Sequence, residues 1–357
     1  MASGNGEKVL VTGASGYIAS HIVQQLLEAG YKVRGTVRSL SNASKVEPLR
    51  KLCPNASSDL ELIEADLTKD EGWKEAVAGC VYVMHTASPF PFANPKDENK
   101  IIKPAVEGTT RVLQACVDQG GVKRVVLTSS VVAVTDFEES RSPDNPFTEE
   151  DWRKERGDAY GKSKLLAERA AWDFVNKLSG ESKFELAVIN PSVVFGPVVC
   201  GSPGTSVNIL KGILTREPGI IPRMHVPFCD VRDVAKAHVV AMTMPEAAGN
   251  RHIVAPYCMM MRDISQILVD EFSDKGYKPV TTVAPNFLLR LMGIFNSEVK
   301  TMSKLVGHTY AYSDKRLRQV LGITPYSAKD TVNDTAYSCI ERGFVPKKEG
   351  YYNPKAK

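Results

Sequence analysis

The stretch VLVTGASGYIA, residues 9–19, decides the fold. An apolar run leads into the spacing G-x-x-G-x-x-A, and a helical pattern begins within the motif. Gly13 lets the chain turn sharply, Gly16 lets the backbone approach a pyrophosphate, and Ala19 permits close helix packing. The first N–H groups of the helix would face the phosphates. The motif therefore predicts a dinucleotide site, with an ordinary strand-to-helix turn as the alternative; its turn residues are Gly13, Ser15, Gly16, Tyr17 and Ile18.

Short runs rich in Val and Ile recur along the first half of the chain, separated by stretches with helical periodicity. The strand-like runs are residues 8–12, 32–37, 60–65, 82–85, 124–128 and 185–189. The helical stretches include residues 16–28, 100–118 and 158–178. Strands that alternate with helices predict an α/β fold, a doubly wound parallel sheet of about seven strands with helices on both faces.

The regular alternation stops after residue 189, where the chain reads NPSVVFGPVVCGSPG. A helical pattern at 231–242 and a strand-like run at 251–255 indicate a return to the sheet. We therefore predict a dinucleotide-binding domain from residues 1–190 and about 230–255. A smaller substrate lobe would comprise about 191–229 and 256–357.

The end of the second predicted strand indicates which dinucleotide is bound. An NAD site would offer Asp or Glu there, yet residues 31–45 read YKVRGTVRSLSNASK, without a carboxylate. Arg38 and Lys45 are placed to meet a 2′-phosphate, which predicts NADP(H); the alternative is two solvated surface charges.

Further cofactor contacts are expected where the next strands end. Asp66 and Leu67 could bracket an adenine ring, although Asp66 could equally cap a helix. Thr86, Ala87 and Ser88 would pass along the cofactor, because ligands bind at the carboxyl edge of such sheets.

Reactive groups are predicted from the run YGKSK, which places Tyr160 and Lys164 on one helix face, one turn apart. Asp158 is expected to cap that helix. A nearby ammonium favours the ionised form of a phenol, so Lys164 is expected to prepare Tyr160 for acid–base chemistry. Ser130, at the end of the fifth strand, would hydrogen-bond the same substrate oxygen. Taken alone, a helical Tyr–Lys pair is more often surface packing.

Composition excludes several other classes. The 357 residues are 43% hydrophobic, and 45 basic against 41 acidic side chains give a net charge of +4 without a basic stripe, which argues against nucleic acid as a partner. The seven cysteines form no C-x-x-C pair and the six histidines form no cluster, so we expect a reducing cytoplasm and no metal site. No run approaches the roughly 20 apolar residues of a membrane span. A monomer and a homodimer both remain open.

Together these motifs resemble the extended short-chain dehydrogenase/reductases, in the group of dihydroflavonol reductases, cinnamoyl-CoA reductases and methylglyoxal or carbonyl reductases. HTASPF at 85–90, NPSVVFGP at 190–197 and DVRDVA at 230–235 resemble segments of that group. The resemblance implies a Rossmann sheet binding NADP(H), with Ser130, Tyr160 and Lys164 as the catalytic set. It also implies that Pro191 and Val194 flank the nicotinamide.

The resemblance implies NADPH-dependent reduction of a small aldehyde or ketone to an alcohol. Thr135 stands where flavonoid reductases have Asn, and RGDAYGK replaces the cinnamoyl-CoA reductase signature NWYCYGK, so neither substrate is expected. The expected substrate contacts are Phe90, Phe92, Thr135 and Phe195. Alternatives are an NAD-dependent hydroxysteroid dehydrogenase/isomerase or sugar-nucleotide epimerase, and a non-catalytic NADP-sensing protein.

Overall fold

A seven-stranded parallel sheet forms the centre of the computed structural model, which describes residues 4, 6–89, 97–201, 203–217, 219–287 and 305–355. The strand order is β3-β2-β1-β4-β5-β6-β9. This order reverses between β1 and β4, as in a doubly wound Rossmann sheet, so the predicted fold class is confirmed. The strands are β1 (Lys8–Val11), β2 (Lys32–Val37), β3 (Leu60–Glu64), β4 (Tyr82–His85), β5 (Arg124–Thr128), β6 (Glu185–Pro191) and β9 (Arg251–Val254).

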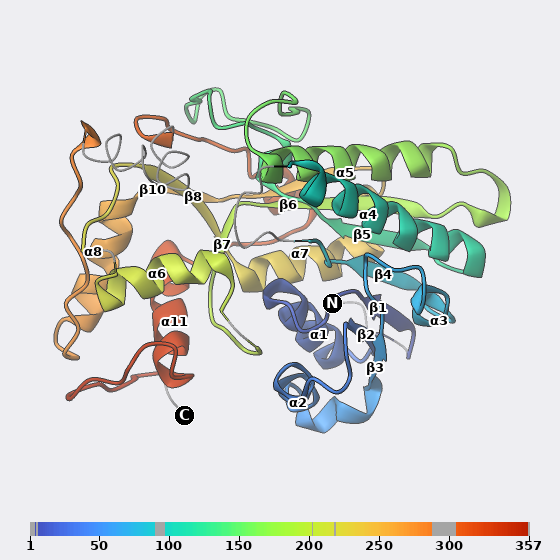
Figure 1. Cartoon of the computed structure of the whole chain (residues 1–357), viewed down its shortest axis with the longest axis horizontal. Helices are drawn as coiled ribbons and strands as arrows, with labels where there is room; N and C mark the ends of the chain where they lie inside the picture. The colour runs from blue at the N-terminus through green and yellow to red at the C-terminus, as the bar shows by residue number, and fades with distance from the viewer. Residues whose placement is uncertain are drawn as a thin grey trace.

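Helices cover both faces of this sheet (Figure 1). One face carries α1 (Tyr17–Glu28) and α7 (Val231–Thr243), and the other carries α3 (Trp73–Val77), α4 (Asn99–Gln119) and α5 (Ala159–Asn176). The short α2 (Ala43–Arg50) follows β2. Successive strand side chains point to opposite faces, so Val9 and Val11 join the core under α1 and α7, whereas Leu10 joins the core under α4 and α5.

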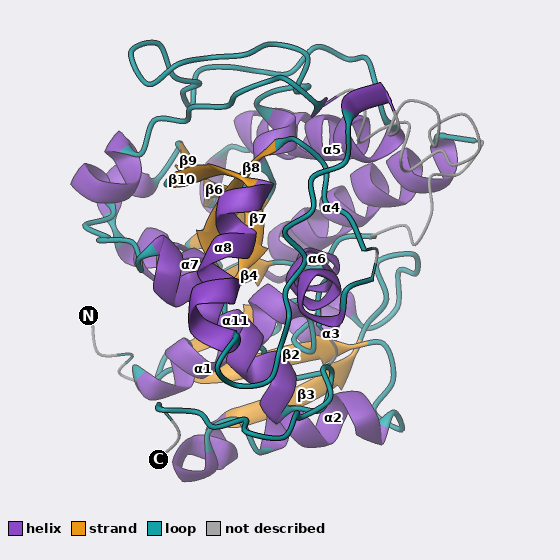
Figure 2. Cartoon of the chain, turned by 90° about the vertical axis from the view of Figure 1, so that its left-hand side faces the viewer, coloured by secondary structure: helices purple, strands orange, loops and turns teal. Residues whose placement is uncertain are grey.

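A second, three-stranded sheet lies beyond the end of β6. It contains β7 (Val193–Phe195), β8 (His225–Asp230) and β10 (Tyr257–Met260), with β7 parallel and β10 antiparallel to β8. Around it pack α6 (Thr205–Thr215), α8 (Met261–Phe272) and α11 (Ala328–Glu341), which lie together at the left end of the molecule in Figure 1 and face the viewer in Figure 2. The sequence analysis predicted a departure from the main sheet here, but not this sheet.

The C-terminal segment also returns to the main sheet. Leu317, Leu321 and Ile323 pack into the core that lies under α1 and α7. Leu317 belongs to the short helix η5 (Arg316–Val320), which lies within the stretch assigned by sequence to the smaller lobe. The proposed division into two parts therefore stays a prediction.

The segment after β7 joins the two sheets. The Tyr17 hydroxyl of α1 donates to the Gly196 carbonyl (2.7 Å), while the Gly196 N–H donates to Oγ1 of Thr335 on α11 (2.6 Å). Gly196 has a φ of +121°, and a Cβ there would lie 2.7 Å from Val231. Glycine is therefore required at this crossing.

Candidate active site

The glycine turn is held by hydrogen bonds to the neighbouring strand β2. The Gly13 N–H donates to Thr36 Oγ1 and the Ala14 N–H donates to the Thr36 carbonyl, both over 2.9 Å. Gly13 has a φ of +65°, and a Cβ on it would lie 3.2 Å from Ala87 Cβ. The turn therefore packs against the segment that follows β4.

Thr12 fixes that segment through its hydroxyl. Its Oγ1 accepts N–H groups from Thr86 (3.1 Å) and Ala87 (2.9 Å) and lies 3.0 Å from Nδ1 of His85. Because both lone pairs are used, the hydroxyl proton goes to Nδ1, and His85 carries its own proton on Nε2. Burial, aided by the charge of Lys164, lowers the pKa of His85 to about 3. His85 is thus a neutral ring that orients Thr12, a role that the sequence analysis missed.

The two cations predicted to bind a phosphate lie on neighbouring segments, Arg38 directly after β2 and Lys45 in α2. Arg38 is exposed where β2 ends. A Cβ placed on Gly201 would lie 3.2 Å from the Ser15 carbonyl and 3.8 Å from Lys45 Nζ, so Lys45 comes beside the glycine turn. Both positions suit a 2′-phosphate on a dinucleotide held at the turn.

Asp66 and Leu67 follow β3 at the same edge of the sheet. Hydrogen bonds from the backbone and hydroxyl of Thr68, with a smaller effect of Arg38, lower the pKa of Asp66. Asp66 therefore shapes its own turn by accepting the Thr68 N–H over 2.9 Å, and none of the helices in the described ranges begins at it. Leu67 packs closely on Gly108, where an added Cβ would lie 3.0 Å from Leu67 Cβ.

The helix that carries Tyr160 and Lys164 begins at an N-cap residue, Asp158, as predicted. Asp158 accepts the Gly161 N–H over 2.7 Å. Arg153 donates to Asp158 (3.3 Å) and to the Val132 carbonyl (3.2 Å), which fixes the first turn of α5 to the short helix η2 (Val131–Ala133). A Cβ on Gly161 would collide with the Arg153 guanidinium, so the glycine in YGKSK makes room for this brace.

Burial dominates the acid–base properties of the pair. It raises the pKa of Tyr160 to about 12, with help from Asp158, and lowers the pKa of Lys164 to about 8 against the effect of Glu168. The pKa of Tyr160 is thus raised and not lowered as expected, because burial and the charge of Asp158 both disfavour the phenolate.

Ser130 lies at the same end of the sheet, directly after β5. Its Oγ donates to the Pro191 carbonyl and accepts the Val132 N–H, both over 3.3 Å. Ser130 is the N-cap residue of η2, and η2 packs against α5. The half-buried Ser130 hydroxyl therefore shares one edge of the sheet with Pro191 and the first turns of α5. Lys164 also reaches toward β4, since its charge acts on His85.

The residues predicted to contact the substrate lie in different environments. Phe195 is fully buried, with its ring centroid 5.4 Å from that of Phe228, so its prediction as a substrate contact is corrected to a core role. Thr135 is buried and accepts the Phe137 N–H over 3.1 Å, which shapes the turn after η2. Val194, which was expected to flank the nicotinamide and not to contact the substrate, packs in the core under α1 and α7. Phe90 and Phe92 lie outside the described residues.

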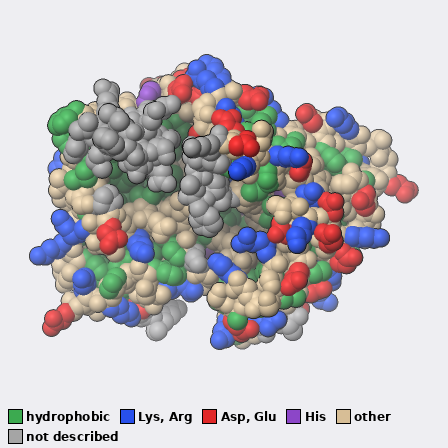
Figure 3. Space-filling model, in the orientation of Figure 1, with side chains coloured by type: hydrophobic (Ala, Val, Ile, Leu, Met, Phe, Trp, Pro, Cys, Tyr) green, Lys and Arg blue, Asp and Glu red, His purple; other side chains and the backbone are tan. Residues whose placement is uncertain are grey.

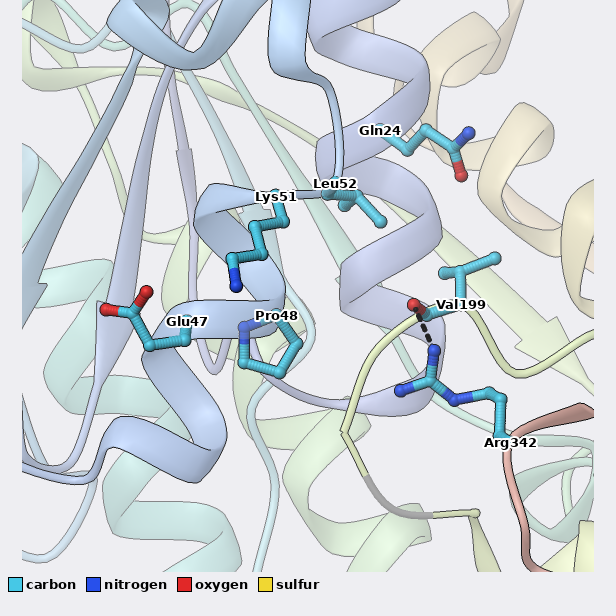
Figure 4. A pocket seen from close by; sticks show the side chains of 7 residues that line it. All are labelled: Gln24, Glu47, Pro48, Lys51, Leu52, Val199 and Arg342. Atoms are coloured by element: carbon cyan, nitrogen blue, oxygen red, sulfur yellow. Dashed lines mark hydrogen bonds between the residues drawn. The ribbon is translucent and has the colours of Figure 1, made fainter.

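A surface pocket of about 520 Å³ lies apart from these groups, between α1, α2, the segment after β7 and the end of α11 (Figure 4). Its charged side chains, Glu47, Lys51 and Arg342, are exposed and of both signs, and Arg342 is bonded to the Val199 carbonyl over 3.1 Å. This mixture does not match the predicted dinucleotide or carbonyl site.

Lys, Arg, Asp and Glu are interspersed over the face shown in Figure 3. Within the described ranges, no group of three or more His, Cys, Asp or Glu side chains could hold a metal ion. A search of the same ranges finds no helix with the length and apolarity needed to cross a membrane.

Comparison with known proteins identifies the family. The model of the NAD dependent epimerase/dehydratase family matches residues 9–255. Dihydroflavonol 4-reductase of Hordeum vulgare is 32% identical over 352 residues, which cover 96% of this chain and 92% of that protein. The NADPH-dependent methylglyoxal reductase GRE2 of Saccharomyces cerevisiae is 32% identical over 354 residues, covering 93% of this chain and 98% of that protein.

A solved structure agrees with the sequence relatives. The crystal structure of yeast methylglyoxal/isovaleraldehyde reductase Gre2 complexed with NADPH matches with a TM-score of 0.79 and 32% identity, over 94% of this chain and 99% of that one. This match agrees with the resemblance found in the sequence motifs. The chain therefore belongs to the NAD dependent epimerase/dehydratase family, as an extended short-chain dehydrogenase/reductase related to the dihydroflavonol and methylglyoxal reductases.

Proposed function

We propose that the chain is an NADP(H)-dependent oxidoreductase that reduces a small aldehyde or ketone to an alcohol. The observation that carries the proposal is the placement of Ser130, Tyr160 and Lys164 at the sheet edge where the glycine turn lies. Relatives that reduce methylglyoxal with NADPH support the same chemistry.

The residues at the turn fit NADP(H). Gly13 adopts the left-handed backbone that the sharp turn needs, Gly16 is exposed at the start of α1, and Arg38 and Lys45 stand where a 2′-phosphate would lie. When bound, NADPH supplies the hydride that reduces the carbonyl carbon.

The chain itself handles the carbonyl oxygen. Ser130 Oγ hydrogen-bonds that oxygen and orients it. Tyr160 donates its phenolic proton to the oxygen as negative charge develops there, and the Lys164 ammonium stabilises the phenolate that remains. Because burial holds the pKa of Tyr160 near 12, the phenol stays protonated at neutral pH and is available as the acid.

The test is turnover by the purified chain. NADPH oxidation is followed by absorbance with a panel of small aldehydes and ketones, and Tyr160→Phe is expected to lower kcat by about 10²- to 10⁴-fold. The NADPH dissociation constant of this variant should stay nearly unchanged. The absence of turnover with every carbonyl would refute the proposal, and tightly bound NAD released on denaturation would point to an epimerase instead.

We further infer that the enzyme works in the cytoplasm, as a monomer or homodimer and without a nucleic-acid partner. All seven cysteines are free thiols, and five of them are buried, which is typical of a reducing compartment. Subcellular fractionation and light scattering would check the compartment and the oligomeric state.

A further inference from the structure

Glu168 is a buried carboxylate at the centre of a hydrogen-bond network beneath the proposed active site. Its side chain accepts hydrogen bonds from Ser129 Oγ (2.5 Å), Asn190 Nδ2 (2.9 Å) and Arg251 Nε (2.6 Å). Ser129 follows β5, Asn190 lies in β6 and Arg251 begins β9. One side chain of α5 thus ties that helix to three neighbouring strands of the main sheet.

The network continues to Ser130. Asn190 Nδ2 also donates to the Ser130 carbonyl over 3.2 Å, and both of its partners are acceptors, which fixes the orientation of the amide. Ser129 precedes Ser130 in the chain, and Pro191, whose carbonyl accepts the Ser130 hydroxyl, follows Asn190. Glu168 therefore restrains the Ser130 backbone from both sides.

The same carboxylate faces the other reactive groups along its own helix. Lys164 lies one turn before Glu168 on α5, and Tyr160 lies one turn further back on the same face. Burial lowers the pKa of Lys164 to about 8, and the negative charge of Glu168 opposes that shift. The other titratable groups near Lys164 are Tyr160, which is neutral, and His85 on β4, whose pKa is lowered to about 3 so that it also carries no charge.

The partner of Glu168 is an equally buried cation. The Arg251 guanidinium stacks on Trp152, with its Cζ 3.8 Å from the ring centroid, and donates to the carbonyls of Glu149 (2.9 Å) and Asp151 (2.6 Å). Buried ion pairs add little net stability compared with well-packed apolar side chains, because desolvation offsets their attraction. A charged pair at this position thus calls for a role other than stability.

We propose that Glu168 is a positioning residue of the active site, which holds Ser130 in place through Asn190 and Ser129 and keeps Lys164 as an ammonium. The proposal rests on the proposed reductase function. It gives Glu168 no contact with substrate or cofactor, so its effect must be transmitted through Ser130 and Lys164.

The experiment uses Glu168→Gln, which keeps the shape of the side chain and removes its charge. The Lys164 titration is measured by NMR on protein carrying ¹³C at the lysine ε-carbons, with Lys164→Arg to assign the signal. We expect this titration, and the alkaline limb of the kcat profile, to move to lower pH, because the variant lacks the negative charge that opposes the lowering of the Lys164 pKa. The KM for NADPH should change little.

The matched control is Glu185→Gln. Glu185 pairs with the buried Arg124 over 2.6 Å and joins β5 to β6 at the opposite end of these strands. This variant should leave the Lys164 titration and the kcat profile unchanged. In the double variant Glu168→Gln/Arg251→Gln no unpaired guanidinium is left buried, so it should be more stable than Glu168→Gln while showing the same shifted titration.

Folded Glu168→Gln with an unshifted Lys164 titration would overturn the proposal, as would an equal shift in Glu185→Gln. If Glu168→Gln does not fold, the Lys164 titration of the double variant tests the proposal instead. Failure of both variants to fold would overturn the proposal and mean that Glu168 acts on stability alone. The absence of carbonyl turnover in the unaltered chain would refute the proposed function. The NMR titration would still report on Glu168, so the two failures are distinguishable.

Discussion

Four buried histidines are expected to make the fold sensitive to mild acid. Burial lowers the pKa of His85 to about 3 and the pKa values of His21, His238 and His252 to about 4. In the unfolded chain the same rings titrate near ~6.5. As the pH falls below that value the unfolded state takes up protons that the folded state does not, so the free energy of unfolding decreases.

The size of the effect follows from these values. For a folded pKa of about 4, lowering the pH from about 7 to about 5 costs roughly 1.8 kcal/mol, so four such rings together cost about 7 kcal/mol. Asp233 works in the opposite direction, because burial raises its pKa to about 7. As the pH falls from about 7 to about 5, Asp233 takes up a proton in the folded chain but not in the unfolded chain, which offsets about 2 kcal/mol of the loss. The net loss of about 5 kcal/mol is a large part of the 5–15 kcal/mol typical of a folded protein.

Urea unfolding followed by circular dichroism, at constant ionic strength and several pH values between about 5 and 7, measures this loss. His238→Gln keeps a polar side chain beside Thr128, whose hydroxyl lies 2.6 Å from His238 Nε2, and should reduce the net loss by about a third. Asp233→Asn should increase the loss. A free energy of unfolding that does not change over this range, or a His238→Gln variant with the same pH dependence as the unaltered chain, would refute the reasoning.

Three substitutions test the cofactor turn. Gly13→Ala places a side chain at a φ of +65° and within 3.2 Å of Ala87 Cβ; it should cost about 1–2 kcal/mol in urea unfolding and weaken NADPH binding, and unchanged values of both would contradict this. Arg38→Ser should weaken NADPH binding by about 10- to 100-fold in a fluorescence titration and leave NADH binding nearly unchanged, whereas an equal loss of both would exclude a 2′-phosphate contact. Thr12→Val leaves the Thr86 N–H and its neighbour without their acceptor and should cost about 1–3 kcal/mol, which an unaltered thermal midpoint would disprove.

Local patterns were enough to predict the main sheet. The six strand-like runs and the three long helical stretches of the first half agree with the structure to within two residues at each end. Parallel strands buried on both faces give continuous apolar runs, and the helices between them keep a clear period. Gly13, Gly16 and the Asp158 cap could likewise be predicted, because their roles depend on neighbouring backbone.

The rest depends on contacts between distant segments, which a local pattern does not encode. Phe195 was expected at the substrate but is buried against Phe228, because β7 and β8 pair across more than thirty residues of chain. Glu168 was overlooked although it stands four residues after Lys164, on the same face of α5. Its significance depends on Asn190 and Arg251, which only the completed sheet brings to it.

The segment after β7 also bears on how the protein is made. During synthesis the main sheet can assemble as far as β6 from residues that have already left the ribosome. The N–H groups of Gly196 and Val198 donate to the hydroxyls of Thr335 and Ser338 on α11 (2.6 and 2.9 Å). These acceptors are translated about 140 residues later, so the two hydrogen bonds form only after that. A nascent chain released before α11 would thus hold all seven strands of the main sheet but leave the segment after β7 without these two acceptors.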